Sequence, residues 1–344
     1  AACLAHDMGN PPFGHSGEKA IQTFFTEGPG STLRDSVSPE FWSDITHFEG
    51  NANAFRLLTH RFCGRRPGGF VMTYPTLASI VKYPYSSMLA GKKGKFGFFA
   101  TEREVYERIA DDLGLRRLSA PGEPLRCARH PLVYLVEAAD DICYEIMDIE
   151  DAHKLRLLSY EETERLGQGV VKAFAAEEQE HIRQRMVEEQ LDDLNERVVY
   201  MRASAIGRLE GECVRAFVDN EGSILAGDFE GSLVEAVSPA VRYAYRRCAE
   251  VSRKRIYRSK PVLDVELSGY KIMATLMEQM VDAVLHPDRY YSRQLIGRVS
   301  SQYDIASPDL ETRLMAVIDY ISGMTDIYAL DVYQKMMGMA LPIV

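Results

Sequence analysis

The chain has 344 residues, of which 46% are hydrophobic and 26% charged, a composition typical of a globular protein with a sizeable core. Its net charge of −10 disfavours nonspecific binding to nucleic acid, so an anionic substrate needs a local basic pocket or a metal ion. The six cysteines are scattered without a CxxC pair, which indicates reduced thiols and not a zinc-thiolate site. No apolar run has the length of a membrane span and no signal peptide is visible, so we expect a cytoplasmic protein.

The most informative segment is the opening run over residues 3–18. His6 and Asp7 place an imidazole beside a carboxylate, a pair suited to a hard or borderline divalent metal. Two glycines and two prolines then end any helix and turn the chain. His15 and Glu18 follow at i, i+3, on one face of a new helix. Buried polar side chains are costly unless paired, so this combination indicates a functional site and not simple packing.

Helical patterns dominate the rest of the chain, and we expect an all-α protein. Apolar spacing predicts helices over 18–25, 41–60, 76–82, 101–113, 132–149, 160–216, 234–251, 266–285 and 310–337. Ser16 is a candidate N-cap for the first of them. Glycine and proline clusters predict loops over 64–76 and 114–129, and turns with room for one small hairpin over 219–231. Without an internal repeat or clear linker, we expect one domain over 1–344, with about 190–344 as its C-terminal helical extension.

A basic segment lies between positions 77 and 99. It combines a helix end at Lys82-Tyr83 with a loop that contains Lys92, Lys93 and Lys95. On its own this segment is equally well explained as a solvated cationic turn. If the segment binds an anionic substrate, its positive side chains would offset the acidic charge of the chain locally.

The predicted helix over 132–149 carries a second group of polar residues. Asp140, Tyr144 and Asp148 recur at i, i+4 and i+8, so they share one face among apolar neighbours. Two carboxylates and a phenol along a partly buried helix are costly unless they bind something. The alternative is a solvated acidic stripe on an amphipathic helix.

These motifs resemble those of one known family, the HD-domain deoxynucleoside triphosphate (dNTP) triphosphohydrolases. The resemblance begins in His6-Asp7, Gly9, the run from Pro11 to His15 and Gly17-Glu18, and it continues in separated motifs to about position 330. Asn10 stands where many relatives carry His, and asparagine at this place resembles the bacterial branch that acts on dGTP. The resemblance implies an HD-domain helical bundle with extra helices.

The resemblance also implies a metal site and a proton-transfer pair. His6, Asp7 and Asp140 would bind one divalent ion, Mn²⁺ or Mg²⁺, together with a histidine upstream of His6. No residue before His6 can supply that histidine, so we expect the sequence to be a fragment that lacks its N-terminal portion. His15 would be the general acid/base, and Glu18 would orient it or tune its pKa.

Six further residues match family positions in the substrate site. Tyr144 would pack on the deoxyribose and exclude a 2′-hydroxyl, and Asp148 would accept a hydrogen bond from the 3′-hydroxyl. Lys82 and Tyr83 would contact the phosphates or another part of the substrate. The last two are Asn10 and Glu49, of which Glu49 could also orient the general acid/base.

The implied reaction is metal-dependent hydrolysis of dGTP, or another dNTP, to a deoxynucleoside and inorganic triphosphate, a step of nucleotide metabolism. The family commonly forms homo-oligomers, in particular hexamers, and single-stranded DNA is a candidate effector. Two alternatives stay open from the residues themselves. One is another HD phosphohydrolase that acts on nucleoside monophosphates or cyclic nucleotides, and the other is an inactive nucleotide-binding regulatory subunit.

Overall fold

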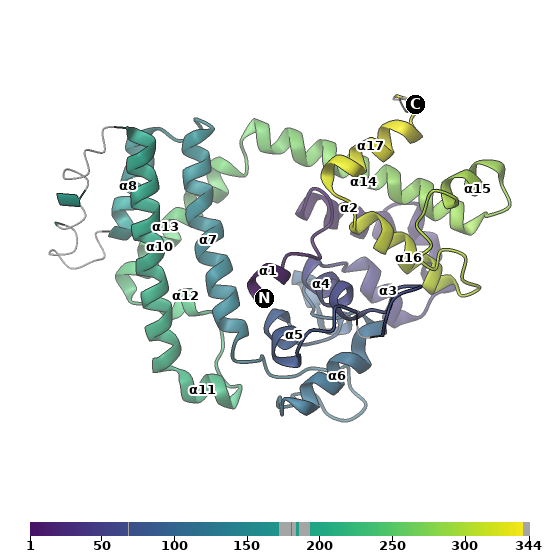
Figure 1. Ribbon diagram of the computed structural model, residues 1–344, viewed down its shortest axis with the longest axis horizontal. Coiled ribbons are helices and arrows are strands. Elements are labelled where there is room, and N and C mark those ends of the chain that lie inside the picture. Colours follow the sequence, from purple (N-terminus) through teal and green to yellow (C-terminus); the bar gives the residue numbers. More distant parts are fainter. Residues whose placement is uncertain (68, 172–179, 181–183, 186–192, 340–344) are drawn as a thin grey trace. The chain divides into compact units, whose positions relative to one another are not determined.

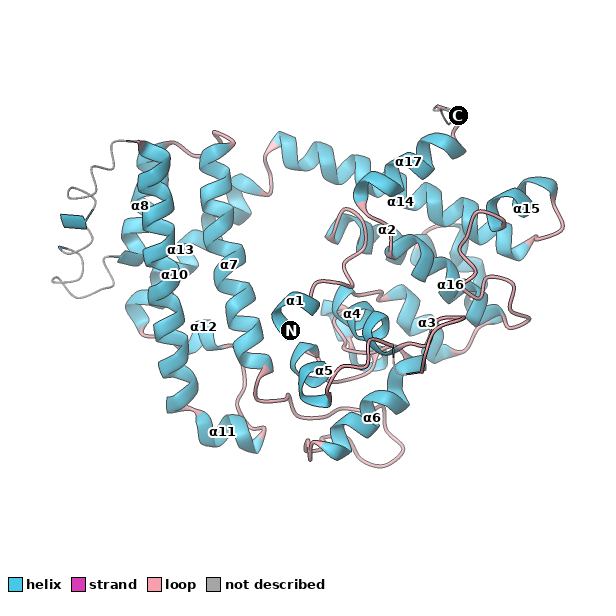
Figure 2. Cartoon of the chain, viewed as in Figure 1, coloured by secondary structure: helices cyan, strands magenta, loops and turns pink. Residues whose placement is uncertain are grey.

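Helices account for the regular structure of the part of the chain that the structure describes. The computed structural model describes residues 1–67, 69–171, 180, 184–185 and 193–339 (Figure 1). Within these ranges, β-type pairing is confined to isolated bridges such as the one that joins Tyr85 to Arg126 (Figure 2). The prediction of an all-α chain is therefore confirmed. Among the described helices, none is both long and apolar enough to cross a membrane.

The chain divides into two units, which are described here one at a time. The first comprises Ala1–His130 and Asp264–Val344, and the second comprises Pro131–Leu263. The second boundary falls inside helix α14 (Lys260–Leu285), whereas the first lies just before helix α7 (Val133–Lys154). The expected single domain with an extension from about position 190 stays a prediction.

The first unit has a core built mainly from α2, α14 and α16, in which Phe25, Met277 and Ile318 are fully buried. A second cluster, which includes Phe55 and Tyr106, packs α4, α5 and α6 together. Besides most of α14, the helices of this unit are α1 (Ala2–Ala5), α2 (His15–Thr26), α3 (Pro39–Thr46), α4 (Gly50–Thr59), α5 (Tyr74–Ile80), α6 (Arg103–Asp112), α15 (Tyr290–Ile296), α16 (Leu310–Ser322) and α17 (Asp326–Met336). Short 3₁₀ turns are η1 (Pro29–Ser36), η2 (Ser87–Leu89), η3 (Gly91–Lys93) and η4 (Ala100–Glu102).

The second unit has its own core, formed by α7, α10 and α13, with Ile142, Leu209 and Val241 buried. Its helices are α7, α8 (Tyr160–Val171), α10 (Leu194–Asp219), α11 (Glu221–Ala226), α12 (Leu233–Ala236) and α13 (Pro239–Val251), followed by the π-turn η5 (Ser252–Ile256). The helix predicted over 160–216 corresponds to α8 and α10. Residues 172–179, 181–183 and 186–192 of that prediction lie outside the described residues.

Several predicted helices are interrupted by caps that apolar periodicity does not reveal. The helix expected over 41–60 is two helices, because the Glu49 side chain caps α4 by accepting hydrogen bonds from the first backbone N–H groups. The helix expected over 310–337 is interrupted likewise, and Thr325 caps α17. The small hairpin allowed for over 219–231 is wrong, since α11 occupies this stretch and ends at Gly227 with φ +73°.

Candidate active site

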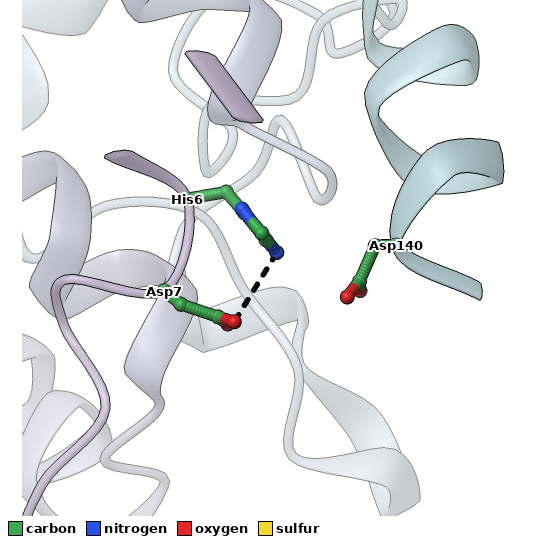
Figure 3. A group of neighbouring side chains, drawn as sticks. All are labelled: His6, Asp7 and Asp140. Carbon is green, nitrogen blue, oxygen red and sulfur yellow. Dashed lines mark ion pairs between the residues drawn. The ribbon is translucent and has the colours of Figure 1, made fainter. Parts of the chain in front are cut away.

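His6 and Asp7 follow α1 and form a pair of metal-ligand type (Figure 3). His6 Nδ1 donates a hydrogen bond to the Cys3 carbonyl oxygen at 2.9 Å, because a carbonyl can only accept. In the neutral ring this bond leaves the lone pair on Nε2, which lies 3.4 Å from Asp7 Oδ2. The other oxygen, Asp7 Oδ1, accepts a hydrogen bond from Asn10 Nδ2 at 3.0 Å. One imidazole nitrogen and one carboxylate oxygen thus lie close together, and both are ligand types that a divalent ion accepts.

Close contact with α4 holds the segment that follows this pair. A Cβ on Gly9 would lie 2.0 Å from a backbone nitrogen of α4, so only glycine allows the approach. The buried Asn53 donates from Nδ2 to the Gly9 carbonyl at 2.8 Å. A Cβ on Gly50 would lie 2.3 Å from Asn10 Oδ1, which places Asn10 against the start of α4. Asn10 thereby connects Asp7 to α4, and its contact with substrate stays a prediction.

His15 begins α2, and Glu18 lies one turn later on the same face, as the i, i+3 spacing predicts. His15 Nδ1 donates to Glu18 Oε2 at 3.0 Å, so Nε2 is the nitrogen left to exchange a proton. The His15 side chain is 83% exposed, whereas the Glu18 side chain is 8% exposed. Glu18 Oε1 accepts a hydrogen bond from the Gly50 backbone N–H at 2.8 Å. A buried, fixed carboxylate therefore orients an imidazole that faces solvent.

Hydrogen bonding and charge set the protonation of this pair. The hydrogen bond to Glu18 is the main reason why the pKa of His15 lies above its ordinary value. Burial raises the pKa of Glu18, but the His15 hydrogen bond and the positive charge of Lys95 outweigh it, so that the pKa of Glu18 lies below its ordinary value. The histidine is thus favoured in its protonated form and the glutamate in its ionised form.

Lys95 connects the proton-transfer pair to the start of α4. Its Nζ lies 2.5 Å from Glu49 Oε1 and 3.9 Å from Glu18 Oε2. The Glu49 side chain is only 1% exposed, and its Oε2 accepts from the Asn51 N–H at 2.8 Å. Sequence reasoning considered Lys95 only as one of three lysines of a basic loop that would offset the acidic charge of the chain in a binding site. Its partners lie 46 and 77 positions away, so no local signal could have singled it out from Lys93.

Lys82 and Tyr83 follow α5 and are both half-buried. A Cβ on Gly97 would lie 2.2 Å from the Tyr83 carbonyl, so the Tyr83 loop packs directly against the segment that follows Lys95. The Tyr83 and Tyr85 rings are also in edge contact, with 6.2 Å between centroids. The proposed contacts of Lys82 and Tyr83 with substrate stay predictions.

In the second unit, α7 carries Asp140, Tyr144 and Asp148 at the predicted one-face spacing. Figure 3 also draws the Asp140 side chain where it leaves this helix. The Tyr257 hydroxyl donates to Asp148 Oδ2 at 2.6 Å, and the Tyr257 ring lies 6.2 Å from that of Tyr144, centroid to centroid. Burial raises the pKa of Asp148 above its ordinary value. Sequence reasoning missed Tyr257, which follows η5 and lies 109 positions from its carboxylate partner.

One expected detail is wrong. Ser16 does not cap α2, because the helix already begins at His15 and Gly14 occupies the N-cap position. The Ser16 hydroxyl instead donates to the Glu266 carbonyl oxygen of α14 at 2.6 Å.

Comparisons with known proteins extend over almost the whole chain. Residues 236–335 match the family model of the phosphohydrolase-associated domain. The chain is 36% identical to a deoxyguanosinetriphosphate triphosphohydrolase-like protein of Pseudomonas aeruginosa, over 99% of this chain and 77% of the relative. A protein of the same name from Synechocystis is 35% identical, over 99% of this chain and 77% of the relative. The deoxyguanosinetriphosphate triphosphohydrolase of Yersinia enterocolitica is 26% identical, over 98% of this chain and 77% of the relative.

A relative at 36% identity along almost the whole chain establishes common descent. The chain therefore belongs to the HD-domain dNTP triphosphohydrolase family.

Proposed function

We propose that this family member hydrolyses dGTP, or another dNTP, to a deoxynucleoside and inorganic triphosphate in a metal-dependent reaction. The observation that carries the proposal is the His15–Glu18 pair, an exposed imidazole held by a buried carboxylate. In such a pair the imidazole can act as a general acid, and the carboxylate orients it. The names of the relatives at 36% and 35% identity support the same substrate class.

We propose that His6, Asp7 and Asp140 bind one divalent ion, Mn²⁺ or Mg²⁺. An imidazole nitrogen and carboxylate oxygens are ligands that Mn²⁺ accepts, and the fixed tautomer of His6 presents its lone pair on Nε2. When bound, such an ion polarises a phosphoryl oxygen and lowers the pKa of a coordinated water molecule. Asp140 is included because the Ala-Asp pair at 139–140 resembles the last ligand motif of the family.

The residues of the chain supply the proton that the leaving group needs. Water oxygen bonds to the α-phosphorus and the water gives up one proton to solvent, while the bond from that phosphorus to the sugar 5′-oxygen breaks. The imidazolium Nε2–H of His15 gives its proton to the 5′-oxygen, so the deoxynucleoside leaves as an alcohol. Glu18 keeps Nδ1–H engaged throughout, which holds the ring orientation and stabilises the positive charge before transfer. The three phosphates leave together as inorganic triphosphate.

We propose substrate-binding roles for the residues that the resemblance singled out: Tyr144, Asp148, Lys82, Tyr83, Asn10 and Glu49. Tyr144 packs on the deoxyribose, and Asp148 accepts from the 3′-hydroxyl with its carboxylate held by Tyr257. Lys82 and Tyr83 contact the phosphates or another part of the substrate. Asn10 and Glu49 complete the substrate site; Asn10 already holds Asp7, and Glu49 already binds Lys95. For this reason we expect Asn10 and Glu49 to act on the substrate mainly by positioning other side chains.

We also propose a cytoplasmic homo-oligomer, a hexamer, with single-stranded DNA as an effector. Membership of the family supports these proposals. Light scattering of the purified chain tests the assembly. Titration with oligonucleotides, with the rate of nucleotide hydrolysis as readout, tests the effector.

The experiment that tests the function is a product assay with each dNTP and each ribonucleotide in the presence of Mn²⁺ or Mg²⁺. We expect intact triphosphate and deoxynucleoside, with dGTP the preferred substrate. Release of pyrophosphate, or activity only on monophosphates or cyclic nucleotides, would identify a different phosphohydrolase. Nucleotide binding without turnover under every metal condition would support a regulatory subunit instead.

A further inference from the structure

We propose that Gly269 and Asp326, far from His15 in sequence, are positioning residues that fix the loop from which His15 projects. This inference rests on the proposed role of His15. Both residues lie in the segment matched by the phosphohydrolase-associated model, for which that match assigns no role in the reaction. All the contacts that carry the argument lie within the first unit.

The loop before His15 has a strained backbone. Phe13 has φ +62° and Gly14 has φ +54°, so two successive residues lie in the positive-φ region. Glycine tolerates this region, but a bulky residue such as phenylalanine is rarely found there. A strained residue persists only when its surroundings over-determine its conformation. Whatever holds Phe13 therefore also holds His15, two positions later.

Two contacts from the C-terminal part of the unit hold Phe13. The Phe13 backbone N–H donates to Asp326 Oδ1 at 2.9 Å. Asp326 itself is fixed in the first turn of α17, a position where a carboxylate is favoured by the helix dipole. On the other side, a Cβ on Gly269 would lie 2.4 Å from Phe13 Cγ and 2.5 Å from Phe13 Cβ. Because Phe13 Cβ is attached to the backbone, a larger residue at 269 must displace the loop itself.

Further contacts fasten α2 along α14. The Ser16 hydroxyl donates to the Glu266 carbonyl at 2.6 Å, one helical turn before Gly269. The Thr23 and Tyr270 hydroxyls lie 2.7 Å apart two turns further along α2. The start of α2 is thus held by α14 and α17 together. A displaced loop changes where His15 points while the metal-ligand pair and the buried core stay in place.

The first test is Gly269→Ala, with the neighbouring surface substitution Ser268→Ala as control. We expect Gly269→Ala to lower kcat by on the order of 10²-fold, the scale for a misplacement of about 1 Å, with KM and bound Mn²⁺ nearly unchanged. In a Phe13→Gly background, Gly269→Ala should change kcat by less than about twofold, because the clashing side chain is gone. An equal loss in both backgrounds, or no loss in either, would overturn the proposal.

The second test compares Asp326→Ala with Asp326→Asn, which keeps the oxygen acceptor. Asp331→Asn is the matched control, since Asp331 lies on α17 and, among the described contacts, pairs only with the half-buried Lys335. We expect the alanine variant to lose kcat and the asparagine variant to retain most of it. Equal effects of both substitutions would contradict a role for this hydrogen bond.

NMR titration of His15 supplies a readout that needs no activity. We expect the pKa of His15 to fall toward its ordinary value in Gly269→Ala and Asp326→Ala, because its hydrogen bond to Glu18 is weakened. If the wild-type chain hydrolyses no nucleotide, the proposed function fails, yet this titration still decides whether the two residues position His15. An unchanged titration in both variants would overturn the inference.

Discussion

Replacement of Lys95 by methionine tests two roles of this residue at once: its contribution to the stability of the fold and its effect on the pKa values of His15 and Glu18. Lys95 is the cation that contacts Glu49, and it also lies within 3.9 Å of Glu18. Methionine keeps a similar unbranched side chain without the charge. The substitution therefore removes an ion pair at the start of α4 and a positive charge beside the His15–Glu18 pair.

The size of the effect on stability follows from burial. Removing one partner of a fully buried ion pair costs about 3–5 kcal/mol. Lys95 is 28% exposed and Glu49 keeps hydrogen bonds from Asn51, so we expect a smaller loss of about 2 kcal/mol. For a unit of this size, that loss lowers Tm by about 4–8 °C.

The effect on the reaction follows from charge. The positive charge of Lys95 lowers the pKa of both His15 and Glu18, so its removal raises the pKa of each. The proposed acid works only while His15 is protonated, that is, below its pKa. The alkaline limb of the kcat/KM profile should therefore move to higher pH in Lys95→Met.

The assays are thermal unfolding followed by circular dichroism, and kcat/KM measured between pH 5 and 10 at constant ionic strength. Lys93→Met is the matched control, because Lys93 lies in the same loop and is exposed. We expect the control to keep the wild-type Tm and profile. An unchanged alkaline limb in Lys95→Met, or a shift to lower pH, would refute the electrostatic argument, and an unchanged Tm would refute the structural one.

Three further predictions address separate parts of the molecule. His15→Ala should retain metal but lower kcat by about 10²–10⁴-fold, and near wild-type kcat would exclude His15 as the general acid. In the wild type, the alkaline limb of the kcat/KM profile should lie above pH 6.5, because the pKa of His15 is raised. Arg56 on α4 is buried and pairs with two buried carboxylates, those of Glu102 and Asp319. Arg56→Ala should therefore destabilise the first unit by about 3–5 kcal/mol in urea unfolding. A loss under about 1 kcal/mol, the scale of an exposed pair, would contradict this. Dideoxy-GTP should be a poor substrate if Asp148 binds the 3′-hydroxyl, and a change in kcat/KM below about twofold would remove that assignment.

Sequence reasoning succeeded where the interaction is local. The i, i+3 relation of His15 and Glu18 and the shared face of Asp140, Tyr144 and Asp148 follow from helical periodicity alone. The all-α fold follows from the same periodicity. Helix ends were less predictable: Glu49 is an unusual capping residue, and the apolar pattern continues across it.

The long-range partners could not be predicted because no periodicity connects them. Lys95 and Tyr257 each meet a site carboxylate only through tertiary packing, over 46 and 109 positions respectively. The bond from Phe13 to Asp326 spans 313 positions. Glycine at 9, 50 and 269 signals close backbone approach, but its partner is visible only in the folded chain.

The most direct test of the proposed function is the fate of water oxygen during turnover. In H₂¹⁸O with dGTP and Mn²⁺, attack at the α-phosphorus must place one ¹⁸O in the released inorganic triphosphate and none in deoxyguanosine, as read by mass spectrometry of both products. Label in the 5′-hydroxyl of deoxyguanosine, or label found in dGMP or pyrophosphate, would contradict the proposed bond cleavage and with it the assignment of His15 as the acid for the 5′-oxygen.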